Sequence, residues 1–173
     1  MNEADLNNTF KYDKVVINLS NHNCLTTDAT KTSFYVNLVE PIKNVVYVKI
    51  IRSSILSTNA MRSAPLSYLR YDPVYISLND YNRSVSYINN NGTFNYANYF
   101  DLIPYSYENF SDISYSQAAF DWSDPSVYIL NPPEQTLKRL NVEFRDKAFN
   151  LFDTAVLTHF NLSICVYYIK NRV

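Results

Sequence analysis

The sequence predicts an all-β fold, a sandwich or barrel of about eight antiparallel strands with long loops. Short runs of alternating apolar and polar residues recur along the chain, separated by polar segments rich in Asn, Asp, Ser and Pro. No stretch shows the period of about 3.6 residues that marks a convincing amphipathic helix. With 173 residues and 47% hydrophobic content, the chain can bury one core, which favours a single domain.

The stretch from 32 to 56 is the centre of the predicted fold. Apolar and polar residues alternate over 34–38, the pattern of a half-buried strand, and 45–55 is β-branched almost throughout. We expect the proline-containing segment 40–44 to form a turn that joins these two limbs into a hairpin. In the second limb the apolar residues change from one side of the strand to the other near Ile50, so we expect a β-bulge or a change of packing partner there.

The other predicted strands are short runs of β-branched or alternating apolar residues. In chain order they span 12–19, 74–78, 84–88, 93–96, 99–104, 127–130, 139–145 and 160–168. The dipeptide Asn91-Gly92 between two of these runs is a strong hairpin signal. The last two strands alternate most clearly. Their expected core residues are Leu140, Val142 and Phe144 in one, and Phe160, Leu162, Ile164 and Val166 in the other.

Two segments fall outside this strand pattern. Residues 1–11 have no period and few large apolar groups, so we expect an arm that is mobile or ordered by a partner. Residues 95–126 are irregular and aromatic, and a structureless connection of that length is uncommon inside a compact domain. We therefore expect an ordered functional loop or insertion at about 80–126, within a domain that spans 12–173.

A single glycine, Gly92, limits the enzyme classes to which the chain can belong. Phosphate-binding loops, dinucleotide fingerprints and nucleophile elbows need several glycines, because their backbones adopt positive φ or approach a ligand closely. No recognisable spacing brings a nucleophile, a base and an orienting group together, so we expect no catalysis and no cofactor. Asparagine tolerates the left-handed conformation and can occupy turn positions that glycine would normally fill.

The charge balance bears on possible partners. A net charge of −1, from 15 basic and 16 acidic residues, provides no basic field that would hold nucleic acid. No apolar run of about 18 residues would span a bilayer, and the start of the chain lacks the pattern of a signal peptide. We therefore expect a soluble protein made in the cytoplasm, with neither nucleic acid nor a membrane span among its interactions.

Four side chains carry atoms that could bind zinc, namely His22, Cys24, His159 and Cys165. They do not form the two closely spaced ligand pairs that are typical of structural zinc sites. We interpret Cys165 as a buried, reduced thiol and His159 as a strand-entry residue that is hydrogen-bonded to a turn. The sequence therefore predicts no metal site.

A family resemblance appears in the order of six segments, which cover nearly the whole chain past Tyr12. They are VVINLSNHN, TSFYVNLVEPIKNVVYVKIIRSSI, VYISLNDYN, YFDLIP, NPPEQTLKRLNVEFRD and LFDTAVLTHFNLSICVYYI. Their order and spacing resemble the single jelly-roll penton and minor capsid proteins of nucleocytoplasmic large DNA viruses. The chain departs from that pattern in the turn 146–150, which lacks a glycine, and after Asn21, where the family usually has an arginine.

The resemblance implies a single jelly-roll sandwich with a structural role in a virion. Most specifically, it implies a penton, made in the host cytoplasm, that forms homopentamers at the fivefold vertices of a large icosahedral capsid. Such a protein would contact major and minor capsid proteins. A minor capsid cement protein is one alternative, and a lectin-like, receptor-binding jelly-roll module is another.

Aromatic residues and arginines are the candidate interface residues. Tyrosine and tryptophan are favoured at protein interfaces because they provide a large, amphipathic contact area, but they also cap β-sheets as ordinary core, and both interpretations stay open here. The candidates in the aromatic segment are Tyr105, Tyr107, Tyr115 and Trp122. The candidates on outward strand positions are Tyr35, Tyr47, Arg139 and Arg145.

Overall fold

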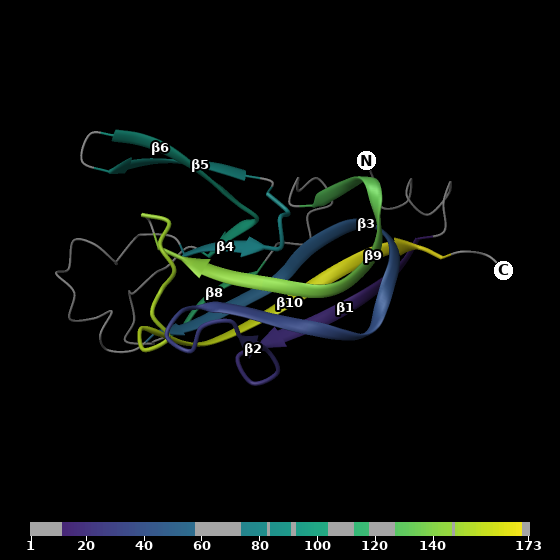
Figure 1. Cartoon of the computed structure of the whole chain (residues 1–173), viewed down its shortest axis with the longest axis horizontal. Helices are drawn as coiled ribbons and strands as arrows, with labels where there is room; N and C mark the ends of the chain where they lie inside the picture. Colours follow the sequence, from purple (N-terminus) through teal and green to yellow (C-terminus); the bar gives the residue numbers. More distant parts are fainter. Residues whose placement is uncertain are drawn as a thin grey trace.

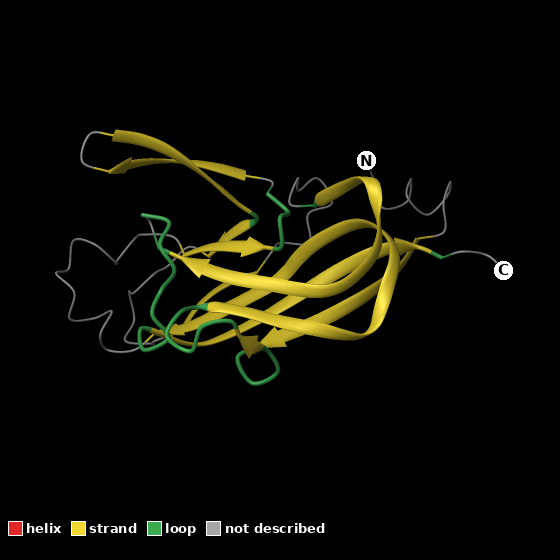
Figure 2. Ribbon diagram, viewed as in Figure 1, coloured by secondary structure: helices red, strands yellow, loops and turns green. Residues whose placement is uncertain are grey.

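The computed structural model describes residues 12–57, 74–82, 84–90, 93–103, 113–117, 127–146 and 148–170. Within these ranges the chain forms strands β1 to β10 and no helix (Figures 1 and 2). All strand pairs are antiparallel. The all-β prediction is therefore confirmed for this part of the chain. The predicted N-terminal arm lies outside the described residues.

The strands differ widely in length, from two residues in β2 to 25 in β3. In chain order they are β1 (Tyr12–Ser20), β2 (Leu25–Thr26), β3 (Ser33–Ser57), β4 (Val74–Leu78), β5 (Ser84–Asn90), β6 (Thr93–Tyr99), β7 (Asp101–Ile103), β8 (Ile113–Gln117), β9 (Tyr128–Arg145) and β10 (Leu157–Ile169). The two longest strands, β3 and β9, organise the others because each of them contributes to both layers of the sandwich.

Strands β3 and β9 bend together and pair along both of their halves. The first half of β3 and the end of β9 form one layer with β4 and β7, the β4–β7 layer. The second half of β3 lies between β10 on one side and β8 and the start of β9 on the other, and β1 lies beyond β10. We call this second group the β1–β10 layer. One curled antiparallel sheet thus supplies both layers (Figure 1).

The predicted hairpin over 32–56 is wrong, because β3 continues through it as one bent strand. Its two halves do not pair with each other, since both find a partner in β9. The register with β9 is interrupted between Asn37 and Ile42, so Pro41 lies where no ladder hydrogen bond is needed. The predicted strands 127–130 and 139–145 are likewise one strand, β9.

The β-bulge predicted near Ile50 is confirmed. Arg52 pairs with Ser163 of β10, whereas Ile50 pairs with Ile164, so β3 contains one extra residue between the two pairs. The buried side of β3 changes parity across this bulge, from Ile50 to Ile55. The extra residue therefore keeps the β-branched side chains on both sides of the bulge in the core.

Aromatic side chains join the two layers at the centre of the core. The ring centroids of Phe34 in the β4–β7 layer and Phe160 in the β1–β10 layer lie 4.7 Å apart, and Phe144 lies 4.9 Å from Phe160. The sidedness predicted for the last two strands is confirmed. Each of the expected core side chains is at most 1% exposed, namely Leu140, Val142, Phe144, Phe160, Leu162, Ile164 and Val166.

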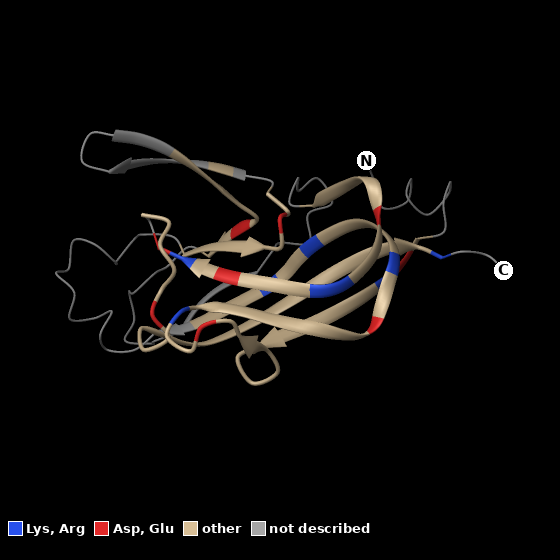
Figure 3. Cartoon of the chain, viewed as in Figure 1, with Lys and Arg blue, Asp and Glu red and all other residues tan. Residues whose placement is uncertain are grey.

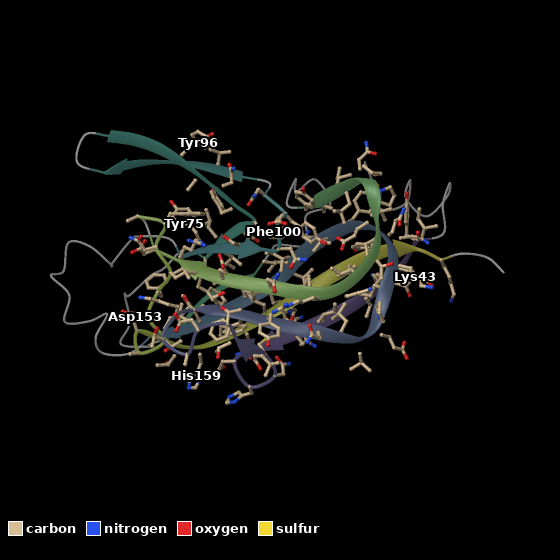
Figure 4. The ribbon with its side chains drawn as sticks, in the orientation of Figure 1. Lys43, Tyr75, Tyr96, Phe100, Asp153 and His159 are labelled. Carbon is tan, nitrogen blue, oxygen red and sulfur yellow. The ribbon has the colours of Figure 1, made fainter. Side chains whose placement is uncertain are left out.

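The hairpin predicted around Asn91-Gly92 is also confirmed, because β5 and β6 pair from Ser84 and Tyr99 to Asn90 and Thr93. This two-stranded sheet is separate from the larger one and projects from it (Figure 1). The rings of Tyr75 and Tyr99 meet at its base, with centroids 4.9 Å apart. Figure 4 shows Tyr96 on the projecting hairpin, away from Tyr75.

The expectation of an irregular segment over 95–126 is wrong in part. Strand β6 continues to Tyr99, and β7 follows within the predicted strand at 99–104. Sequence reasoning missed β8, whose residues 113–117 pair with 52–56 of β3. The pairing between β9 and β3 ends at Val48, and β8 pairs with the same edge of β3 further along the strand.

Positive φ angles at two asparagines confirm that this residue type takes left-handed turn positions. Asn44 at the bend of β3 has φ of 54°, and Asn79 after β4 has φ of 46°. Phe149 also has positive φ, 66°, in the turn 146–150 where the sequence lacks glycine. That turn is closed by the backbone N–H of Asp146, which donates to the carbonyl of Asn150 over 2.9 Å.

Candidate interaction faces

Three tyrosines gather on the outer side of the β1–β10 layer. The ring centroid of Tyr47 lies 5.6 Å from that of Tyr12 and 6.3 Å from that of Tyr167, and both ring pairs are T-shaped. Tyr47 and Tyr167 are directly paired across β3 and β10, so the pleat of the sheet directs both away from the core. Burial and the neighbouring Tyr12 raise the pKa of Tyr47 above its ordinary value.

Basic and apolar side chains surround these tyrosines. Val16 and Ile129 are 46% and 64% exposed. The outward positions of β1, β10 and the second half of β3 include three basic residues and no acidic one among the described residues. We define the tyrosine face by the outward residues Tyr12, Lys14, Val16, Tyr47, Lys49, Arg52, Ile129 and Tyr167.

The outer side of the β4–β7 layer brings together two of the predicted interface residues. The guanidinium carbon of Arg139 lies 3.7 Å from the centroid of the Tyr35 ring. Register explains this contact, because Tyr35 pairs with Asn141 and is therefore a diagonal neighbour of Arg139. The Arg139 side chain makes no hydrogen bond or ion pair with the described part of the chain, so its N–H donors are available to a partner.

A polar cleft of about 680 Å³ lies beside the Arg139–Tyr35 pair. Its lining includes three carboxylates and one guanidinium. Glu143 is paired with Arg145, so the excess negative charge of the cleft comes from Asp80 and Glu134. We define the carboxylate cleft by Asn79, Asp80, Glu134, Arg139, Asn141 and Glu143. Charged residues of both signs occur along the strands of the chain (Figure 3), so this local excess is a property of the cleft and not of the whole molecule.

Backbone hydrogen bonds fix one wall of the carboxylate cleft. The N–H of Asn79 donates to the carbonyl of Asn141 over 2.9 Å, and the N–H of Asn141 donates to Oδ1 of Asn79 over 2.7 Å. The left-handed conformation of Asn79 permits this reciprocal pair, and it turns the chain directly into Asp80. The Asp80 carboxylate is exposed and makes no hydrogen bond or ion pair with the described residues.

Tyr81 holds Glu134 in the lining of the cleft, and Tyr128 packs against Tyr81. The hydroxyl of Tyr81 donates a hydrogen bond to Oε2 of Glu134. The Tyr81 ring is buried and stacks on Tyr128, with centroids 5.1 Å apart. Burial and the bond to Glu134 raise the pKa of Tyr81 above its ordinary value. The position of this carboxylate is therefore determined by core packing.

Arg145 is engaged within its own molecule. Its guanidinium donates to Oε2 of Glu143 over 2.6 Å and to the carbonyl of Phe149 over 2.9 Å. The guanidinium carbon also lies 5.1 Å from the centroid of the Phe149 ring. These contacts brace the turn that holds Phe149 in its left-handed conformation.

The remaining predicted interface residues belong to the aromatic segment. Tyr115 lies in β8, where its backbone is opposite Ser54 of β3. Tyr105, Tyr107 and Trp122 lie outside the described residues. Sequence reasoning did not single out Lys49, Arg52, Asp80 or Glu134. Outward parity on β3 could have identified the two basic residues, but no local signal places the two carboxylates in one cleft.

The four potential zinc ligands are used in other ways. Nδ1 of His159 lies 2.9 Å from the amide nitrogen of Asn21, which confirms the predicted hydrogen bond to a turn, and its ring stacks on His22 with centroids 5.8 Å apart. Cys165 is a buried free thiol, as predicted, and burial raises the pKa of the Cys24 thiol. Among the described residues no group of three or more His, Cys, Asp or Glu side chains is placed to hold a metal ion.

Comparison with known proteins finds neither a family model nor a curated protein that matches this chain. The described ranges also contain no helix long and apolar enough to cross a membrane. The proposed function therefore rests on the ordered sequence segments, the strand order and the two outer faces.

Proposed function

We propose that this protein is a structural component of a virion, a penton that forms homopentamers at the fivefold vertices of a large icosahedral capsid. The observation that carries the proposal is the order of the strands in the two layers. It agrees with the order expected of a jelly roll, the fold that the family resemblance of the sequence implies.

A jelly roll consists of two packed layers built from two Greek keys, in which strands that are neighbours in space are distant in the chain. Strands β3 and β9 cross from one layer to the other, so each of them corresponds to two strands of a jelly roll, one in each layer. One layer then has the order β1, β10, second half of β3, start of β9. The other has the order first half of β3, end of β9, β4, β7. The first strand pairs with the last, which supports a jelly roll.

The jelly roll hosts several functions, including those of viral capsid proteins and lectins, so fold alone does not select among them. The ordered sequence segments favour a capsid protein. The distribution of the candidate contacts agrees with a ring, because Tyr47 lies on one outer face while Tyr35 and Arg139 lie on the other. A heterologous contact uses two different surfaces of each copy, and it closes into a ring of five when each copy is rotated by one fifth of a turn.

Assembly tests the proposal. A specific interface needs about 1,000 Å² of total buried area, and a smaller one would need the surrounding capsid proteins to hold the ring. We expect the isolated protein to equilibrate between monomer and pentamer as its concentration rises, as measured by native mass spectrometry. In a virion reconstruction, density for this chain should lie around the fivefold axes. Density only between major capsid trimers would refute the penton and leave the cement role.

A lectin-like module is the second candidate, and the open carboxylate cleft is the observation that favours it. The Arg139 guanidinium and the Asp80 carboxylate line this cleft, and neither makes a side-chain hydrogen bond or ion pair with the described residues. Hydroxyl groups of a sugar both donate and accept hydrogen bonds, so they could engage groups of both kinds. Monomeric protein that binds glycans, and loses that binding on Arg139→Ala, would favour this candidate over the penton.

A further inference from the structure

We propose that the tyrosine face of one copy docks onto the carboxylate cleft of the next copy in a head-to-tail contact. This inference rests on the proposed homopentamer and names the two surfaces that would form it. Three observations carry it: the separation of charge between the two surfaces, the apolar centre of the tyrosine face, and the availability of Arg52 on one surface and Asp80 on the other.

The chain is nearly neutral overall, but basic side chains lie on the outer side of one layer and carboxylates on the outer side of the other. The whole sequence has a net charge of −1, yet Lys14, Lys49 and Arg52 lie on the tyrosine face without an acidic residue among its described outward positions. The carboxylate cleft lies on the other layer, where Asp80 and Glu134 face the Arg139 guanidinium and the third carboxylate, Glu143, is paired with Arg145. Complementary potentials of this kind steer association and fix the register of two surfaces.

The tyrosine face has the composition of an interface centre. Tyr47 and Tyr167 are partly exposed on neighbouring strands, and Ile129, directly paired with Tyr47, is 64% exposed. Tyrosine and arginine are enriched in protein interfaces, and apolar groups at the centre exclude water from the surrounding charge pairs. A partner that covers this face would therefore bury apolar area and desolvate the ion pairs at its rim.

Arg52 and Asp80 are the side chains best placed to pair between copies. Both are exposed, and neither makes a side-chain hydrogen bond or ion pair with the described part of the chain. A new ion pair between them would break none that the described residues form. Arg52 follows Tyr47 and Lys49 along the outer side of β3, and Asp80 follows Asn79 in the lining of the cleft.

The same charges argue for a second copy in a head-to-tail arrangement. A twofold contact of the tyrosine face with itself would bring basic side chains together, and a twofold contact of the cleft would bring carboxylates together. Joining the tyrosine face to the cleft pairs opposite signs instead. Both surfaces can be occupied at once because they lie on different layers, so the contact can be repeated from copy to copy.

A charge swap in the full-length chain tests this contact. Arg52→Glu and Asp80→Lys should each weaken self-association at least about tenfold, because each brings like charges together. The double variant restores opposite signs, and its association should return to within about threefold of the unaltered protein. Asp80→Asn removes charge without reversing it and should give a smaller loss. Sedimentation equilibrium measures association, and far-UV circular dichroism confirms that each variant folds.

The matched controls lie at the bend of β3, where Glu40 and Lys43 are exposed and belong to neither surface. Glu40→Lys and Lys43→Glu reverse the same charges and should change association by less than about threefold. Raising the salt concentration should weaken the unaltered protein and the double variant alike, because exposed pairs are screened over about 8 Å at physiological ionic strength.

The possible outcomes test the proposed contact and the proposed penton separately. A pentamer that tolerates both single swaps would overturn the contact and retain the penton. A polymer or ring of another size that is broken by each swap and restored by the pair would support the contact and refute the penton. Single variants that weaken association without rescue in the double variant would overturn the contact, as would unaltered protein that stays monomeric at every concentration.

Discussion

Replacing Phe160 with alanine should destabilise the protein by about 3–5 kcal/mol, the range measured for Phe→Ala in packed cores. The side chain is 1% exposed, and its ring contacts Phe34 and Phe144 across the sandwich at centroid distances of 4.7 and 4.9 Å. Truncation would remove both contacts and leave a cavity where the layers meet. Because domains are typically stable by about 5–15 kcal/mol, this loss would be a large share of the total.

Urea unfolding, followed by circular dichroism, measures this loss through the midpoint and slope of the transition. Tyr96→Ala is the matched control, because that aromatic side chain is 71% exposed and its removal should change stability by less than about 0.5 kcal/mol. A double-mutant cycle with Phe34→Ala should show a coupling of about 0.5–1.5 kcal/mol. A loss below about 1 kcal/mol for Phe160→Ala, with an unchanged slope, would refute the idea that this aromatic cluster joins the layers.

Other predictions concern the strand faces, pH and metals. Leu162→Asp should abolish folding because it buries an unpaired carboxylate at a cost of several kcal/mol. Ser163→Asp, on the outward side of the same strand, should lower stability only slightly. Equal melting temperatures for the two variants would contradict the assigned sidedness. Folding raises the pKa of Tyr81 above its ordinary value of 10.0, so the stability that it contributes is present below about pH 10 and lost as pH rises further. Tyr81→Phe should reduce that alkaline loss in urea titrations, and an unchanged pH profile would refute the linkage. Elemental analysis should find no stoichiometric zinc, and zinc that is lost on His22→Ala would contradict this expectation.

Local sequence determined which sides of the strands are buried. In β9 and β10 the alternation of apolar and polar residues predicts the core side correctly from Leu140 to Phe144 and from Phe160 to Val166, because side chains in a strand point alternately to opposite faces. Cys165, on the outward side of β10, is buried as well. Turn conformations that depend on one or two neighbouring residues could also be predicted from the sequence. Asn91-Gly92 predicted the β5–β6 hairpin, and asparagines occupy left-handed positions at Asn44 and Asn79. Each of these features depends on residues within a few positions of one another.

Tertiary structure decided which strands pair and which side chains meet. The segment 40–44 is compatible with both a turn and a bend, and it bends because β9 pairs with both halves of β3. Strand β8 has no clear sequence signal and depends on the open edge of β3. Arg139 meets Tyr35, and Asp80 shares a cleft with Glu134, only through register between distant segments. Such contacts depend on which of several possible long-range strand pairings is most stable. A shift of one residue in the register would move every side chain of a strand to the opposite face of the sheet. A short window of sequence does not contain this information.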